Sequence, residues 1–110
     1  MDFKQIVKDV LLTEAKELEK AATNISFDIE KAIDLIINSK GKLIVTGVGK
    51  SGLVGAKIAA TLASTGTSSF FLHPTEAMHG DLGMISKGDI VLGISYSGES
   101  EELVQILPHL

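Results

Sequence analysis

The feature that most constrains the fold is an alternation of short β-branched segments with helical segments over residues 41–110. Leu43-Ile44-Val45-Thr46 is a brief apolar run that Gly47 ends, which is typical of a buried parallel strand. Two further strands are expected over residues 68–72 and 90–95, with helices over about 51–64, 74–79 and 99–107. Strands that alternate with helices in this way predict a right-handed parallel α/β sheet with helices on both faces.

Residues 1–40 predict a helical leader, so we divide the chain into residues 1–40 and residues 41–110. An amphipathic pattern predicts one helix from residue 2 to about 23, and Ser26 is placed to cap a second helix that Gly41 ends. The two helices are expected to form a hairpin whose apolar residues pack in a core. These residues are Phe3, Ile6, Val7, Val10 and Leu11 in the first helix and Phe27, Ala32, Ile33, Ile36 and Ile37 in the second.

The composition fits a single soluble globular domain and excludes several kinds of function. A content of 45% hydrophobic and 22% charged residues is that of a folded protein, and a net charge of -4 gives no general attraction for nucleic acid or an anionic membrane. No apolar stretch is long enough to span a membrane, and no signal peptide is expected. The absence of cysteine excludes disulfides, thiolate metal sites and a cysteine nucleophile, and it favours an intracellular compartment.

A glycine-rich segment, Gly47-Val48-Gly49-Lys50-Ser51-Gly52, stands between the first strand and its helix. Glycines let the backbone approach a ligand and a helix N-terminus offers free N–H groups, so the segment predicts an anion site. It also matches the dinucleotide fingerprint, but His73-Pro74 stands where that fingerprint needs an acidic residue. A Walker A loop fails because Ile44 occupies a required glycine position. A tight turn without a ligand remains the alternative.

A hydroxyl-rich segment, Ser95-Tyr96-Ser97-Gly98-Glu99-Ser100, follows the third strand and opens the last helix. Its hydroxyl and backbone N–H groups suit a phosphate. The alternative is structural, with Ser97 as a helix cap and Glu99 as a residue that complements the helix dipole. Both motifs follow parallel strands, and open α/β sheets bind ligands at the carboxyl ends of their strands. The two motifs are therefore expected to form one site.

Two histidines, His73 and His79, flank the short helix expected after the second strand. Each is able to carry a proton near neutral pH, and a structural or capping role is the alternative for each. Their spacing of six residues does not match the one-turn spacing of a helical metal pair.

Five segments of the chain together resemble a known family. They are Gly47-Val48-Gly49-Lys50-Ser51-Gly52, Ser64-Thr65-Gly66-Thr67, Phe70-Phe71-Leu72-His73-Pro74, His79-Gly80-Asp81-Leu82-Gly83-Met84 and Ser95-Tyr96-Ser97-Gly98-Glu99-Ser100. In this order and spacing they resemble the SIS (sugar isomerase) domain, most closely that of the arabinose-5-phosphate isomerases. The resemblance covers residues 41–110 without a gap and implies a three-layer, parallel-sheet α/β SIS domain of the flavodoxin-like type.

The resemblance implies an isomerase that interconverts D-ribulose 5-phosphate and D-arabinose 5-phosphate through an enediol, for synthesis of the lipopolysaccharide sugar Kdo or of capsule. It implies that Lys50 and Glu102 stand at catalytic positions. A carboxylate suits the base and an ammonium stabilises the developing oxyanion, so Glu102 is the candidate base and Lys50 the candidate stabiliser, with a solvated helix carboxylate as the alternative for Glu102. No cofactor is required, although His73 is implied as an inhibitory zinc ligand. The implied substrate-binding residues are Gly49, Ser51, Gly66, Thr67, His73, His79, Ser95, Ser97 and Ser100.

The partners that the resemblance implies are a pentose 5-phosphate and further copies of the chain, in a cytoplasmic homo-oligomer that is commonly a tetramer. Family members continue into two more strands that carry a further Glu and a His, so the sheet here is expected to be incomplete. One alternative is a sugar-phosphate-binding module without catalysis, or an inactive fragment of the isomerase. Another is a dinucleotide-binding oxidoreductase.

Overall fold

The computed structural model describes residues 1–98, apart from the side chains of Asp81 and Leu82. The chain divides into two compact units, residues 1–34 and 35–110, which we describe separately. The helix expected over residues 99–107 lies outside the described residues.

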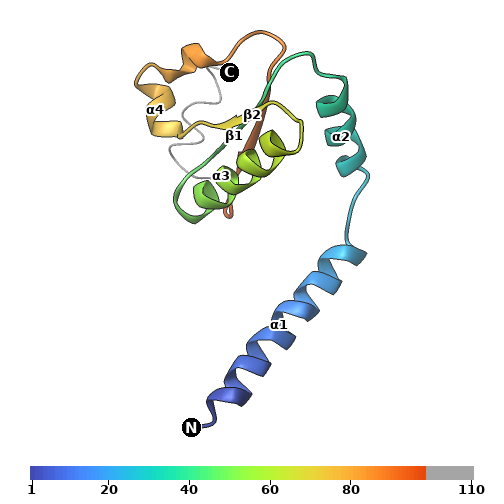
Figure 1. Cartoon of the computed structure of the whole chain (residues 1–110). Coiled ribbons are helices and arrows are strands. Elements are labelled where there is room, and N and C mark those ends of the chain that lie inside the picture. The colour runs from blue at the N-terminus through green and yellow to red at the C-terminus, as the bar shows by residue number, and fades with distance from the viewer. Residues whose placement is uncertain (99–110) are drawn as a thin grey trace. The chain divides into compact units, whose positions relative to one another are not determined.

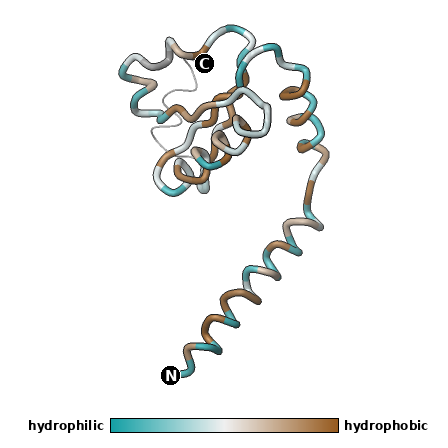
Figure 2. Tube along the Cα trace, viewed as in Figure 1, coloured by the Kyte–Doolittle hydropathy of each residue, from teal (hydrophilic) through white to brown (hydrophobic). Residues whose placement is uncertain are grey.

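The second unit is built on a three-stranded parallel sheet in the order β2-β1-β3 (Figure 1). The strands are β1 (Leu43–Gly47), β2 (Ser69–Phe71) and β3 (Ile90–Ile94). All five residues of the central strand β1 are buried, and Figure 2 shows apolar residues concentrated along the strands. A strand covered on both faces needs a continuous apolar run, which is the pattern that predicted it. The parallel sheet is therefore confirmed.

Helices and a 3₁₀ turn lie between the strands. The α3 helix (Gly49–Ser64) begins two residues earlier than expected, while α4 (Pro74–Met78) is followed by the turn η1 (Asp81–Met84). Apolar residues of α3 pack with Val45 on one face of the sheet, and Ala77 of α4 packs with Ile44 on the other. Both faces of the sheet are covered, as the three-layer interpretation requires.

The two helices predicted for the leader are present, as α1 (Phe3–Thr23) and α2 (Asp28–Asn38). The Oγ of Ser26 accepts a hydrogen bond from the backbone N–H of Asp28 at 3.2 Å, so Ser26 stands at the start of α2 as expected. The prediction that the apolar residues of these helices pack in a core is wrong for the single chain, because neither helix contains a buried residue. The exposed fraction is 71% for Phe3 and 82% for Phe27. Ile36, which belongs to the second unit, packs against the sheet core. Among the described residues, no helix is both long and apolar enough to cross a membrane.

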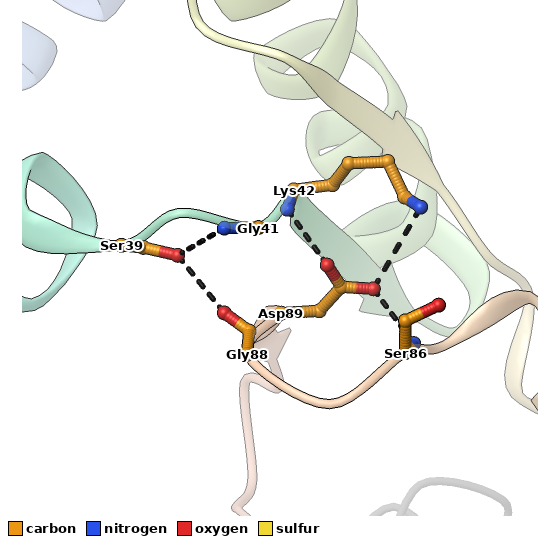
Figure 3. Close-up of polar contacts among 6 residues, drawn as sticks. All are labelled: Ser39, Gly41, Lys42, Ser86, Gly88 and Asp89. Atoms are coloured by element: carbon orange, nitrogen blue, oxygen red, sulfur yellow. Dashed lines mark hydrogen bonds and ion pairs between the residues drawn. The ribbon is translucent and has the colours of Figure 1, made fainter.

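Asp89 ties together the amino ends of β1 and β3 (Figure 3). One carboxylate oxygen accepts the backbone N–H of Lys42 at 2.7 Å, and the other accepts that of Ser86 at 2.8 Å. The Nζ of Lys42 lies 3.8 Å from the second oxygen, and only 3% of the Asp89 side chain is exposed. The backbone hydrogen bond from Lys42 and then that from Ser86 hold the pKa of Asp89 below its usual value, and the Lys42 ammonium adds to them while burial opposes the shift.

Gly41 is required here by close approach rather than as the end of a helix, because α2 already ends at Asn38. A Cβ on Gly41 would lie 2.6 Å from the carbonyl oxygen of Gly88 and would also contact the carboxylate of Asp89. The Oγ of Ser39 bridges the same place, since it donates to the carbonyl of Gly88 and accepts from the N–H of Gly41, both at 3.0 Å. The turn before β1 and the turn before β3 are thus held together by polar contacts.

Replacing Asp89 tests this contact through the pH dependence of stability. Because the pKa of Asp89 is lower in the folded state, its contribution is complete above the unfolded value of about 3.9 and is lost as the pH falls through the folded value. We expect Asp89→Asn to lower the Tm by several degrees at pH 7, and the difference from the wild type to shrink below about pH 4.

Thermal unfolding followed by circular dichroism measures both effects. Asp28→Asn is the control, because Asp28 is exposed and lies 4.0 Å from Lys31 in a surface ion pair that contributes little. A difference between Asp89→Asn and the wild type that is the same at pH 7 and pH 3 would contradict this account.

Candidate functional site

The loop after β1 leaves the first turn of α3 open to a ligand. Val48 is the N-cap residue of α3, and its extended backbone comes with no side-chain hydrogen bond to the helix. Gly49 has a φ of +61°, a left-handed conformation that glycine adopts without strain. The first N–H groups of an uncapped helix carry a partial positive charge, so this loop suits an anion.

Gly52 lets α3 pack directly on the end of β1. A Cβ at this position would lie 2.7 Å from the carbonyl oxygen of Gly47, which is closer than real contacts allow. The glycine-rich motif therefore serves two purposes, because one glycine turns the loop and the other brings the helix against the strand. A tight turn without a ligand would explain why position 52 is glycine. It would not explain why the start of α3 lacks a side-chain cap.

The loop after β3 closes on itself through Ser95. The Oγ of Ser95 accepts the backbone N–H of Gly98 at 2.9 Å, and Gly98 has a φ of +75°. The capping role considered for Ser97 stays a prediction, because the helix expected over residues 99–107 falls outside the described residues. Tyr96 is fully exposed between the two serines.

These two loops meet in one hollow, which we call the carboxyl-edge hollow. It has a volume of about 700 Å³ and is lined by Val48, Lys50, Ser51, Val54, Ile94, Tyr96 and Ser97. The loops meet because β1 and β3 are adjacent and parallel, with Gly47 paired to Ile94 at the carboxyl ends. The expectation that Lys50, Ser51 and Ser97 lie together is confirmed.

The polar groups of the carboxyl-edge hollow favour a negatively charged ligand. Among the lining residues that the structure describes, Lys50 is the one charged side chain, and the hydroxyls of Ser51 and Ser97 are able to donate hydrogen bonds. No carboxylate is among the lining residues up to position 98. Sequence reasoning assigned no role to the apolar lining residues Val48, Val54 and Ile94, which only the folded loop brings to the hollow.

The two histidines hold the ends of α4 and do not line the carboxyl-edge hollow. His73 is the N-cap residue, and its Nδ1 accepts the backbone N–H of Thr75 at 3.1 Å. His79 is the C-cap residue, and its backbone N–H donates to the carbonyls of Ala77 and Glu76. The capping alternative considered for His73 is thus present in the structure, and the role of either histidine as a substrate contact stays a prediction.

The described residues do not fit a zinc site at His73. They contain no group of three His, Asp or Glu side chains that could hold a metal ion. A metal also needs a free lone pair on the imidazole, and the lone pair of Nδ1 already accepts a hydrogen bond from Thr75.

Gly66 and Thr67 lie at the opposite edge of the sheet from Lys50. They precede β2 and line a second hollow of about 380 Å³ together with Leu43 and Ile90, the first residues of β1 and β3. One chain therefore does not bring Gly66 and Thr67 to the carboxyl-edge hollow, and their assignment to the sugar site stays a prediction. Ser100 and Glu102 lie outside the described residues, so their roles stay predictions as well.

In a comparison with known protein families, residues 35–110 match the SIS domain. The chain therefore belongs to the SIS domain family.

Two relatives of the chain are named for the same activity. It is 49% identical to the "Probable arabinose 5-phosphate isomerase" of Haemophilus influenzae over 110 residues, which are 100% of this chain and 33% of that protein. It is 52% identical to the arabinose 5-phosphate isomerase KdsD of Yersinia pestis over 110 residues, which are 100% of this chain and 34% of that protein. The chain thus spans about a third of the length of these relatives.

A solved structure extends the similarity to three dimensions. It is an Escherichia coli CFT073 protein in complex with arabinose 5-phosphate, which matches this chain with a TM-score of 0.93 and 44% identity. The match covers 98% of this chain and 57% of that chain. The fold predicted from the resemblance is confirmed.

Replacing Gly49 tests whether the loop after β1 depends on its left-handed backbone. Nothing lies within 4 Å of a Cβ built at Gly49, so the cost of Gly49→Ala is conformational alone, about 1–2 kcal/mol. Gly49→Asn is the matched variant and is expected to lose less, because asparagine tolerates this conformation better than alanine. The free energy of unfolding in urea measures both, and equal stability of Gly49→Ala and the wild type would contradict the loop geometry.

Proposed function

We propose that the protein containing this chain is an aldose–ketose isomerase that interconverts D-ribulose 5-phosphate and D-arabinose 5-phosphate. The observation that carries the proposal is the carboxyl-edge hollow, which is lined by the uncapped start of α3 with Lys50 and by the loop after β3. The activity for which the two relatives are named and the arabinose 5-phosphate bound in the similar structure support the same substrate class. The activity is proposed for the whole protein, since this chain is a third as long as its relatives.

In the proposed complex the phosphate lies at the start of α3. The backbone N–H groups of the first turn and the hydroxyls of Ser51 and Ser97 donate to its oxygens. This arrangement holds the sugar by the end that does not react, so that its carbonyl and the adjacent carbon reach the catalytic groups. Ser95 and Ser100 complete the hydroxyl set in this proposal.

The chemistry needs only proton transfer. A base removes a proton from C1 of the ketose, and the C2 oxygen gains the negative charge of the enediolate. Return of that proton to carbon C2, with transfer of the O1 proton to O2, gives the aldose. Lys50 is the proposed stabiliser of the oxyanion and Glu102 the proposed base. Carbon-bound hydrogen moves between neighbouring carbons with no net oxidation, so the proposal requires no cofactor.

A non-catalytic sugar-phosphate-binding module is the second candidate function. It is favoured by one observation, that no carboxylate lines the carboxyl-edge hollow among the residues described up to position 98. The two candidates differ in turnover and not in binding.

The activity of the full-length protein with D-ribulose 5-phosphate separates the candidates. We expect the wild type to form D-arabinose 5-phosphate, and Lys50→Met to lower kcat by about a hundredfold or more because an oxyanion loses its stabilising charge. Lys57→Met is the control, since Lys57 is exposed on the same helix but outside the hollow, and it should keep full activity. Binding of the sugar phosphate without turnover would favour the module, and binding of NAD(H) instead would favour an oxidoreductase.

We also propose that the protein is a cytoplasmic homo-oligomer, with a tetramer as the expected state. The assignment of Gly66 and Thr67 to the sugar site supports this, because residues at the amino edge of the sheet reach a carboxyl-edge site only from another copy. His73 and His79 are proposed substrate contacts in the same assembly.

The exposed face of α1 supplies a surface for such association. Apolar residues recur every three or four positions along one stripe of α1, which is exposed throughout its length. At 100° per residue, Lys4, Lys8 and Glu19 lie on the same flank of this stripe. In a two-fold antiparallel pair, this flank of one helix faces the same flank of the second helix, which runs in the opposite direction. Lys4 and Lys8 near the start of one helix then lie close to Glu19 near the end of the other. We therefore propose an antiparallel pair of α1 helices. The stripe consists of Phe3, Val7, Leu11, Ala15, Leu18 and Ala22.

A charge placed in this stripe should break the association. Leu11→Glu puts a carboxylate in the middle of the stripe and is expected to reduce the molar mass of the full-length protein in size-exclusion chromatography with light scattering. Lys16→Glu is the matched control, because it introduces the same residue on the opposite side of α1. An unchanged mass for Leu11→Glu would contradict pairing through α1, and a monomeric wild type would mean that the stripe packs within one chain.

A further inference from the structure

The imidazole of His73 performs a capping role that is usually given to a short polar side chain. Pro74, the first residue of α4, has no N–H, so the backbone N–H of Thr75 is the first donor that the helix offers. The Nδ1 of His73 accepts this N–H at 3.1 Å, and the His73 carbonyl accepts the N–H of Ala77 at 3.0 Å. The ring is therefore held by a hydrogen bond whose direction is fixed.

The direction of this hydrogen bond determines where the ring proton lies. A backbone N–H only donates, so Nδ1 must present its lone pair, and a neutral imidazole then carries its one proton on Nε2. We infer that the cap of α4 fixes His73 in the Nε2–H tautomer, so that His73 meets a ligand as a hydrogen-bond donor and binds a metal ion only by giving up the cap. The ligand atom that suits this donor is an oxygen, such as a carbonyl, a hydroxyl or a phosphate oxygen.

Neither ring nitrogen is free for a metal ion while α4 is capped. The lone pair of Nδ1 is used by Thr75, and Nε2 has no lone pair in this tautomer. Moving the proton to Nδ1 would give Nε2 a lone pair. The Nδ1–H group would then face the backbone N–H of Thr75, another donor, at 3.1 Å. The inhibitory zinc that the sequence resemblance implies at His73 thus competes with the start of α4. Because zinc can bind His73 only when the N-cap of α4 is lost, the free energy of the cap weakens zinc binding by about twofold to thirtyfold.

Nitrogen NMR of the full-length protein labelled with ¹⁵N-histidine tests the tautomer directly. Long-range ¹H–¹⁵N correlations distinguish a proton on Nε2 from one on Nδ1, and His73→Asn identifies the His73 signals by their loss. We expect the Nε2–H pattern for His73 in the neutral ring. His79 is the internal control, because it holds α4 through its backbone. A neutral His73 with its proton on Nδ1 would overturn the inference.

A zinc titration of the same protein tests the competition. We expect either no coordination of zinc at His73 or coordination accompanied by loss of the Thr75 amide hydrogen bond, seen as faster hydrogen exchange of that amide. Zinc bound to His73 with the Thr75 amide unchanged would overturn the inference.

Two substitutions separate the cap from the metal in this experiment. His73→Asn restores a side-chain acceptor and should keep the Thr75 amide protected, with or without zinc. His73→Leu should leave that amide unprotected, and protection that survives His73→Leu would show that the ring does not hold the helix.

Discussion

The backbone hydrogen bonding between β1 and β3 is the interaction on which the rest of the structure depends. It pairs five residues of each strand in parallel, from Leu43 with Ile90 to Gly47 with Ile94. Asp89 fixes the amino end of this pairing through two backbone N–H groups, and the carboxyl-edge hollow opens at the other end. A slip of one residue would turn every β3 side chain to the other face and separate the two loops. The register of one strand pair therefore sets the geometry of the candidate site.

The charge of the protein makes this local geometry necessary. A chain with a net charge of -4 does not attract a phosphate as a whole, so the attraction must come from oriented N–H groups and a single nearby cation. The uncapped start of α3 and Lys50 meet this requirement, and the glycines at 49 and 52 allow the backbone to be placed there. These groups suit a phosphate but do not include a base, so the described residues fit both an isomerase and a binding module.

Much of the fold could be predicted from the sequence, because continuous β-branched runs identify buried strands and glycines mark where they end. The shared hollow followed from the rule that parallel strands present their carboxyl ends at one edge. The packing of α1 and α2 could not be predicted, since periodicity tells which face of a helix is apolar but not what covers it. The role of Asp89 in joining β1 and β3 could not be predicted, because a single acidic residue before a strand does not indicate which backbone N–H groups it will bind. The cap at His73 was only an alternative, because its acceptor role depends on a ring orientation that the sequence does not specify.

In the proposed complex the loops after β1 and β3 hold one anionic ligand together. Amide chemical shifts of the full-length protein during a titration with D-arabinose 5-phosphate test this claim most directly. We expect the amides of Lys50, Ser51 and Ser97 to shift together with a single dissociation constant. Shifts in only one of the two loops, or shifts with different dissociation constants, would contradict it.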